Sequence, residues 1–400
     1  MRRVSLILPA LLAACTSADA PADARWQGSI DTLASGTVVV HNPAAGIWDS
    51  ARAWHVREDL RIGSVMDEGP AMFGDVRSVA VDAAGRIYVL DGQAQEIRVF
   101  GPDGAYVRTI GRKGGGPGEL ADAVAVLMRP GRADFWVVDY GNARYMRFDT
   151  AGRVLETVHR PFAYSSYPWR GALDTAGHVM EQNIVHATQE RPQREVLVRL
   201  DGAGAPVDTV DLPTFEPEQL VINNAAGRPM MSRTIPFTPQ QVRLIDPRGY
   251  VWSAITDRYR IAQQSFAGDT VRIVERDVQP REVTDAEADE MAARINEGAD
   301  PRLRIDRSRF GTTQRLIWTM LLDDSHHLWV RSDAADSARR GDFDVFDPRG
   351  RYLGRADSDV PLFDWIRPQV IGDRLYGVVR DSLDVPFVVR ARIDGRAPRR

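Results

Sequence analysis

The side chains best suited to binding chemistry in this chain are long and polar, and they stand at the start of short apolar runs. They are Arg77, Arg170, Gln241, Arg315 and Arg367. A guanidinium group presents paired N–H donors that match the oxygens of a carboxylate, sulfate or phosphate. If these residues meet in the folded chain, we expect a ring of donors that attracts an anion. The alternative is that each arginine pairs with a neighbouring Asp or Glu.

A second set of candidates follows strand-like runs, where loops on one face of the molecule could gather them around a ligand. It consists of Asp91, Asp139, His159 and His186. Trp318, near the start of an inner strand, is a further candidate for ligand contact. The two histidines could begin a metal site, but a zinc ion needs at least a third ligand. The main expectation is therefore a site without a cofactor and without catalytic residues. A Zn or Ca site remains the alternative.

The N-terminus has the pattern of an export signal. Arg2 and Arg3 precede an apolar run over 4–12 that is too short to span a bilayer. The closing Leu-Ala-Ala-Cys resembles the bacterial lipobox, which implies that 1–14 is removed and that Cys15 is lipidated. The small and polar residues that follow predict a flexible tether over 15–35.

The elements that must position the candidates are repeated β-hairpins. The pattern Asp-x-x-Gly-x-apolar-aromatic-apolar begins at Asp82, and copies of it begin at Asp174, Asp246 and Asp323. Looser copies occupy 130–138 and 371–379. A second turn follows each hairpin by roughly twenty residues, with alternating apolar residues before most of these turns. Each unit is therefore expected to be a four-stranded meander.

Six such meanders predict an all-β chain, because one meander cannot bury both of its faces alone. We expect a six-bladed β-propeller over 36–400. An open ring would leave an exposed edge strand, so the segment 54–63 is expected to pair with a strand near the C-terminus. The run at 36–42 is expected to add a strand nearby.

Two insertions interrupt the repeat. One is the Pro-containing segment at 212–237, and the other lies at about 282–300. In the second, Thr284 and Glu287 form a capping box and Gly298 offers a stop, so one amphipathic α-helix is expected. Two roles are considered for this helix: it could cover an edge of the propeller, or it could bind a partner.

The first two units are similar to the NHL repeat. The similarity rests on "IYVLDGQAQEIRVF", "VRTIGRKGGGPGEL" and "WVVDYGNARYMRF", while the later units keep the turns and lose the signature. The resemblance implies a propeller that binds a ligand, since most members bind something and a minority are enzymes. Gluconolactonase-like propellers with a divalent cation, and amidating lyases with a His-ligated zinc, define the enzymatic alternative.

Composition narrows the function further. The net charge of −4 gives no case for nucleic acid, and the single cysteine excludes an intramolecular disulfide. By resemblance to Gram-negative lipoproteins, Thr16 after the lipidated cysteine implies the outer membrane, with the protein facing the periplasm or the cell surface.

The sequence thus predicts an exported, monomeric binding module whose only contact with the membrane is the N-terminal lipid. Its expected partner is a small anionic molecule, a glycan or an envelope protein. The alternatives are a metal-dependent lyase or lactonase and a structural scaffold of the envelope.

Overall fold

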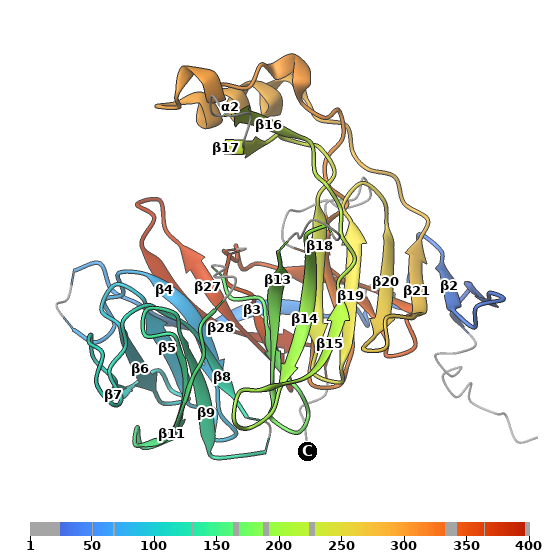
Figure 1. Ribbon diagram of the computed structural model, residues 1–400. Helices are drawn as coiled ribbons and strands as arrows, with labels where there is room; N and C mark the ends of the chain where they lie inside the picture. Colours follow the sequence, from blue (N-terminus) through green and yellow to red (C-terminus); the bar gives the residue numbers. More distant parts are fainter. Residues whose placement is uncertain are drawn as a thin grey trace, which may run out of the picture.

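The computed structural model is a ring of antiparallel sheets around a central axis (Figure 1). Residues 1–24, which hold the predicted signal peptide and Cys15, lie outside the described part of the chain. No helix among the described residues is long and apolar enough to cross a membrane. The structure describes residues 25–49, 51–66, 69–129, 131–162, 168–186, 192–223, 229–332, 342–363 and 365–396.

The ring has six blades, as the sequence predicts, and each blade places its first strand at the axis. Blade 1 consists of β4 (Val76–Val81), β5 (Ile87–Asp91), β6 (Glu96–Phe100) and β7 (Tyr106–Ile110). Blade 2 consists of β8 (Ala123–Met128), β9 (Asp134–Asp139), β10 (Arg144–Asp149) and β11 (Val154–His159). Blade 3 consists of β12 (Ala172–Leu173), β13 (Val179–Val185), β14 (Arg194–Leu200) and β15 (Pro206–Asp211).

The other three blades carry the additions to the basic four-stranded pattern. Blade 4 consists of β18 (Gln241–Asp246), β19 (Tyr250–Ile255), β20 (Arg260–Ser265) and β21 (Thr270–Arg276). Blade 5 consists of β22 (Ile317–Leu322), β23 (Leu328–Ser332), β24 (Phe343–Phe346) and β25 (Tyr352–Ser358). Blade 6 consists of β26 (Gln369–Ile371), β27 (Arg374–Arg380), β28 (Pro386–Asp394) and, from the N-terminal part of the chain, β3 (His55–Ile62).

The repeated aspartates build the turns of the hairpins. Asp82 accepts hydrogen bonds at Oδ1 from the backbone N–H groups of Ala84 (2.9 Å) and Arg86 (3.0 Å), while Gly85 has a φ of +76°. Such Asx turns satisfy backbone donors that the strands cannot reach. His326 takes the place of Gly85 in blade 5 with a φ of 64°, a left-handed conformation that histidine tolerates.

Strand β3 closes the ring as predicted. It pairs antiparallel with β28 from Ile62 opposite Val388 to His55 opposite Asp394. It also touches the last strand of blade 5, because two of its residues pair in parallel with β25. The two ends of the chain are therefore joined in one sheet, which leaves β28 no open edge.

The N-terminal hairpin differs from the prediction in two respects. Strand β1 (Ser29–Thr32) lies within the predicted tether over 15–35, and it pairs with β2 (Val38–Asn42). Strand β2 then pairs in parallel with β21, so the hairpin extends blade 4 and not the closing sheet. The outermost strand of every blade offers unpaired backbone groups, and no sequence pattern distinguishes one such edge from another.

The core lies between the blades. Each of the six interfaces between neighbouring blades has its own cluster of buried apolar residues. In five of the six blades, the large residue that follows the hairpin turn is aromatic and belongs to these clusters. Tyr88 and Trp329 are fully buried, and Trp136, Trp252 and Tyr376 are nearly so. These aromatic side chains therefore serve packing between blades, where each contributes roughly 1.5–3 kcal/mol by burial.

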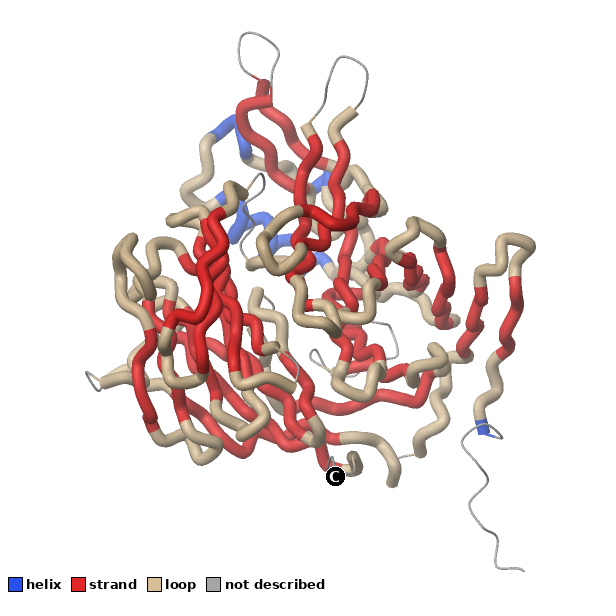
Figure 2. The backbone as a smooth tube through the Cα atoms, turned by 60° about the horizontal axis from the view of Figure 1, so that its bottom comes forward, coloured by secondary structure: helices blue, strands red, loops and turns tan. Residues whose placement is uncertain are grey.

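Both insertions lie on the side of the ring where the inner strands begin (Figures 1 and 2). The first forms a hairpin of β16 (Gln219–Asn223) and β17 (Pro229–Thr234). The second forms α2 (Asp285–Asn296) with the predicted capping box, followed by the short 3₁₀ turns η1 (Pro301–Leu303) and η2 (Arg307–Arg309). We call these five elements the cap.

The cap is held together by contacts between its two insertions. Arg233 of β17 donates a hydrogen bond to the carbonyl of Leu303 at 3.4 Å. At the base of the cap, the rings of Phe237 and Phe310 have centroids 5.9 Å apart, and Gly311 N donates to the carbonyl of Pro236 at 3.0 Å. The cap is thus a second layer above the entrance of the channel.

Candidate functional site

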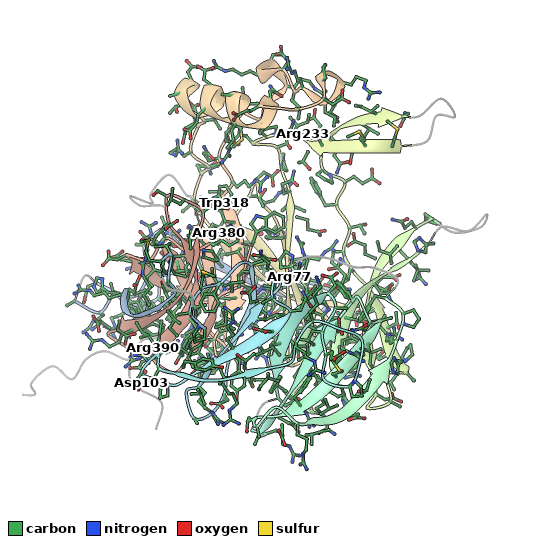
Figure 3. The ribbon with its side chains drawn as sticks, turned by 90° about the vertical axis from the view of Figure 1, so that its left-hand side faces the viewer. Arg77, Asp103, Arg233, Trp318, Arg380 and Arg390 are labelled. Carbon is green, nitrogen blue, oxygen red and sulfur yellow. The ribbon has the colours of Figure 1, made fainter. Side chains whose placement is uncertain are left out.

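The central channel holds a cavity of about 420 Å³. Every blade contributes to its wall, from the first strand or from the segment just before that strand. Figure 3 shows Trp318, one of the lining residues, on the side of the ring that carries the cap. Concave sites of this kind, with polar groups converging from several elements, are the usual places for ligands.

The structure brings six of the predicted site residues together in this cavity. Strands of different blades begin at the same end of the ring, and so residues distant in sequence become neighbours at the axis. The lining includes Arg77, Arg170, Gln241, Arg315, Trp318 and Arg367. Their expected role in binding stays a prediction at this point.

Two arginines of the lining are neutralised by acidic neighbours. Arg77 pairs with Asp75 at 2.8 Å and with Asp122 at 2.5 Å. Arg243, which the sequence analysis did not single out, pairs with Glu195 and donates to Gln241 Oε1 at 2.5 Å. For Arg77 the structure thus shows the pairing with neighbouring acids that was the alternative to anion binding.

Three other arginines have no carboxylate partner among the described residues. They are Arg170, Arg315 and Arg367 of blades 3, 5 and 6, and the described cavity wall contains no Asp or Glu at all. Arg367 donates one hydrogen bond, to the carbonyl of Arg243 at 3.3 Å. Like charges without a counter-ion raise the free energy of the folded chain. An anionic ligand bound beside these arginines would therefore be stabilised by their charge.

The pKa values reflect this environment. Burial lowers the pKa of Arg315 below its ordinary value. Burial and, to a smaller extent, the charge of Arg170 lower the pKa of Arg367 to about 10. At neutral pH these guanidinium groups remain protonated, so the cavity keeps its positive charge.

Tryptophans stand beside the unpartnered arginines. The cavity wall includes Trp169, Trp318 and Trp365. Trp318 and Trp365 leave 40% and 55% of their surface exposed, respectively, which is unusual for so large an apolar residue. The guanidinium carbon of Arg315 lies 5.4 Å from the centroid of the Trp318 ring. Trp365 was not among the predicted site residues, although its spacing from Arg367 could have suggested it.

Asp91 and Asp139 do not line the cavity. Asp91 accepts hydrogen bonds from the backbone of Gly74 (3.0 Å) and Gln93 (3.0 Å). Asp139 accepts from Asp122 N at 3.1 Å and pairs with Arg144 at 3.3 Å. Both carboxylates are buried and hold the loops that connect neighbouring strands and blades. Their prediction as ligand-binding residues is therefore corrected: the Asp that ends the second strand is a structural part of the repeat.

The two histidines of the alternative metal site lie outside the cavity wall. His159 is exposed at the end of β11, the outermost strand of blade 2, and His186 is exposed just beyond β13 of blade 3. Within the part of the chain that the structure describes, no three His, Cys, Asp or Glu side chains gather as a metal site would require.

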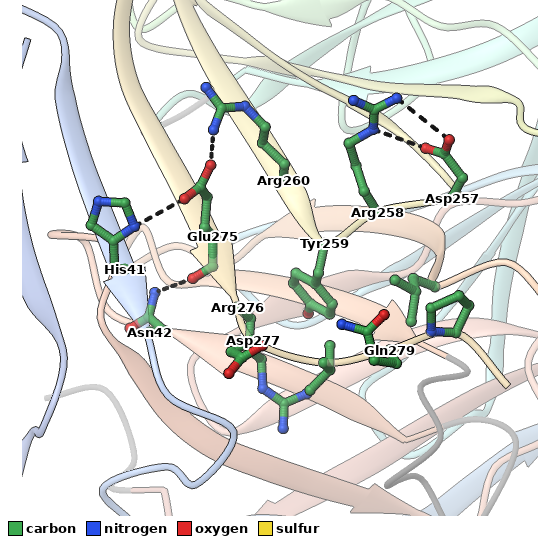
Figure 4. Close-up of a pocket in the computed structure, with 13 residues that line it drawn as sticks. His41, Asn42, Asp257, Arg258, Tyr259, Arg260, Glu275, Arg276, Asp277 and Gln279 are labelled. Carbon is green, nitrogen blue, oxygen red and sulfur yellow. Dashed lines mark hydrogen bonds and ion pairs between the residues drawn. The ribbon is translucent and has the colours of Figure 1, made fainter.

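A second cavity, of about 400 Å³, lies at the periphery between blades 4 and 5 (Figure 4). Its charged side chains are largely paired. His41 lies 2.9 Å from Glu275 and 3.0 Å from Asp31, and Glu275 also pairs with Arg260. Because these side chains already contact one another, the second cavity has fewer polar groups available to a ligand than the central cavity has.

The comparisons with known proteins agree with the fold. The model of the family DUF5128, a 6-bladed beta-propeller, matches residues 71–171, which span blades 1 and 2. No sequence among curated proteins matches the chain.

Several solved structures are similar to the chain at low sequence identity. A protein from Bacteroides fragilis, described as a candidate exported protein, has 10% identity and a TM-score of 0.49, over 89% of this chain and 99% of that one. Virginiamycin B lyase from Staphylococcus aureus has 10% identity and a TM-score of 0.43, over 85% and 99%. The calcium-binding protein regucalcin from Agrobacterium tumefaciens has 13% identity and a TM-score of 0.37, over 90% and 97%.

Proposed function

We propose that this six-bladed propeller is a non-catalytic binding module that takes an anionic ligand in its central cavity. The observation that supports this most is the group formed by Arg170, Arg315 and Arg367, which have no acidic partner among the described residues. An arginine presents five N–H donors in a planar fork, so three of them can surround a multiply charged oxyanion.

The composition of the cavity favours an anion over a metal ion. Divalent cations prefer carboxylate and other oxygen ligands or imidazole, and the described cavity wall has neither acidic residues nor histidines. A metal-dependent lyase or lactonase would therefore have to build its site elsewhere. For this reason the binding module is the function that we propose.

The place of action that we propose rests on the N-terminal sequence. The basic residues at 2–3, the apolar run at 4–12 and Cys15 have the order of a bacterial lipoprotein signal. We propose that the protein is exported and anchored by a lipid at Cys15, so that its cavity meets ligands of the bacterial envelope. Labelling with a lipid precursor, lost in C15S, tests this part.

The binding proposal is tested by titrating the protein, purified as the cell processes it, with citrate and with inorganic phosphate. We expect binding that weakens as the salt concentration rises, and a loss of at least tenfold in affinity in R170Q, R315Q and R367Q. The matched control is R132Q, because Arg132 is exposed in the β8–β9 turn at the opposite end of the ring.

The same variants give a second readout. Burial and the charge of Arg170 both disfavour the charged form of Arg367, so R367Q should raise the melting temperature while it weakens binding. Equal affinity in the wild type and in the triple arginine variant would refute the proposal. Stoichiometric zinc or calcium in the purified protein would instead favour the lyase or lactonase.

A further inference from the structure

The three unpartnered arginines of the cavity share a feature beyond their charge. Each has a tryptophan within three positions along the chain, and the tryptophan also lines the cavity. The pairs are Trp169 with Arg170, Trp318 with Arg315, and Trp365 with Arg367. We call these pairs the Arg–Trp doublets, and they come from blades 3, 5 and 6.

The paired arginines of the cavity differ in this respect. Arg77 and Arg243, which have acidic partners, have no tryptophan within three positions. An aromatic ring therefore accompanies the arginines that are available to a ligand and is missing beside those that are not. Within this cavity, the presence of a tryptophan thus coincides with the absence of an acidic partner for the arginine. We take this as an indication that the tryptophans contact a ligand in addition to packing.

The rings are held in different ways. Trp318 is close enough to the guanidinium of Arg315 for a cation–π contact, with 5.4 Å between the guanidinium carbon and the ring centroid. Trp169 lies against Gly171, where a Cβ atom would overlap the indole ring. The glycine thus makes room for the ring beside Arg170. Trp365 is more than half exposed at the wall of the cavity.

We propose that the ligand is an acidic saccharide, with sugar rings stacked on the tryptophans and carboxylates bound by the neighbouring arginines. This inference rests on the proposed function and names the class of anion. The face of an indole ring is electron-rich and attracts the slightly positive C–H groups on the face of a pyranose. One doublet can therefore recognise both parts of a uronic acid, its ring and its carboxylate.

The polar residues of the cavity fit hydroxyl groups. Gln241 uses its Oε1 to accept a hydrogen bond from Arg243, and Gln369 uses its Nε2 to donate to the carbonyl of Val79 at 2.7 Å. In each amide the other polar atom has no hydrogen-bond partner among the described residues and can serve a ligand. Trp318 and Trp365 also stay partly in water, which suits a sugar ring better than an aromatic acid that would need full burial.

The presence of three doublets favours a ligand with more than one charged ring. A small acid with a single charge would use one doublet and leave the other two arginines without a counter-ion. A short chain of uronic acids repeats the same ring and charge, as the blades repeat the doublet. Trp318 marks the side of the cavity that faces the cap (Figure 3), and we expect such a chain to enter from this side.

The test compares three probes by calorimetric titration of the full protein: trigalacturonate, neutral maltotriose and citrate. Trigalacturonate should bind at least tenfold more tightly than citrate, and maltotriose should not bind measurably. W318A and W365A should each weaken trigalacturonate at least tenfold and leave citrate unchanged, while W318F retains most of the affinity. The matched control is L383A, which removes another exposed apolar side chain.

The outcomes separate this inference from the proposed function. If citrate binds as tightly as trigalacturonate and the tryptophan variants change neither, the saccharide class is wrong while the anion site stands. If neither anion binds and R367Q changes nothing, the proposed function itself fails. Tight binding of maltotriose would also overturn the inference, because the arginines would then have no part in recognition.

Discussion

At the residue scale, the charge of the cavity is distributed unevenly around the axis. Blades 1 and 4 contribute Arg77 and Arg243, which are neutralised by Asp75 and Asp122 and by Glu195 of blade 3, respectively. Blades 3, 5 and 6 contribute arginines without such partners. An anionic group is therefore expected between these three arginines. The asymmetry gives an otherwise pseudo-symmetric ring a single orientation for its ligand.

Tyr88, which is buried between blades 1 and 2, should make the stability of the protein depend on pH. Its hydroxyl donates to Asp82 at 3.2 Å, and burial, followed by the charge of Asp82, raises the pKa of Tyr88 to about 12. In the unfolded chain a tyrosine ionises near pH 10. A raised folded-state pKa stabilises the protein fully below pH 10, and this contribution is lost as the pH rises toward 12.

We therefore expect the free energy of unfolding to fall above pH 10, with Tyr88 contributing about 1.4 kcal/mol for each pH unit. Y88F should cost about 1 kcal/mol at pH 7 through the lost hydrogen bond, and its deficit should shrink as the pH rises above 10. Urea unfolding between pH 7 and 11 measures both effects. Y106F, at an exposed position of β7, is the control, and parallel pH profiles for Y88F and the wild type would contradict the assignment.

At the element scale, Asn42 at the end of β2 joins the N-terminal hairpin to two blades. Its Nδ2 donates to the carbonyls of Glu275 (3.0 Å) in blade 4 and Gly350 (2.9 Å) in blade 5. Its Oδ1 accepts from Tyr352 N at 2.7 Å and from Trp26 Nε1 at 3.0 Å. One buried amide thus satisfies backbone groups that would otherwise be left without partners.

Replacing Asn42 by alanine should therefore destabilise the protein by roughly 2–3 kcal/mol, because buried backbone donors and acceptors lose their partners. Chemical unfolding should show a lower midpoint, and hydrogen exchange should increase in β2, β21 and the Gly350 turn. N223A, at the exposed end of β16 in the cap, should change stability by less than about 0.5 kcal/mol. An equal loss in the two variants would show that Asn42 has no special role.

At the scale of the whole molecule, stability depends on closing the ring. Strand β3 covers the outer edge of β28, whose buried residues include Val388, Val389 and Ile393. A ring opened at this point would expose an apolar edge strand, and such edges pair with other molecules. The cap and the N-terminal hairpin, in contrast, are additions to blades that are already complete.

A chain that begins at residue 51 keeps β3 and should remain a folded monomer of lower stability. A chain that begins at residue 64 lacks β3 and should associate or aggregate, because β28 becomes an unpaired edge. Size-exclusion chromatography and thermal unfolding distinguish the two. If both truncated chains remain monomeric with the same melting temperature, closure by β3 is not required.

Much of this architecture could be read from local patterns. The Asp-x-x-Gly turns at Asp82, Asp174 and Asp323 predict the hairpins, because turn geometry and alternating burial are short-range properties. The capping box at Thr284 predicts α2 for the same reason. Since blades repeat, counting turns also predicts the number of blades. The placement of Arg77, Arg170, Gln241, Arg315 and Arg367 at the axis then follows from their position at the start of each inner strand.

Only the tertiary structure decided which of these residues are available to a ligand. Arg77 and Arg170 occupy similar sequence contexts, yet Arg77 meets Asp122 from the next blade and Arg170 meets no described acid. Asp91 and Asp139 looked like ligand-binding residues and are instead bonded to loop amides. The sequence also did not predict that β2 pairs with β21 of blade 4. Ion pairs and the pairing of edge strands join residues that are distant along the chain. They therefore depend on the folded geometry and cannot be predicted from the sequence of one segment.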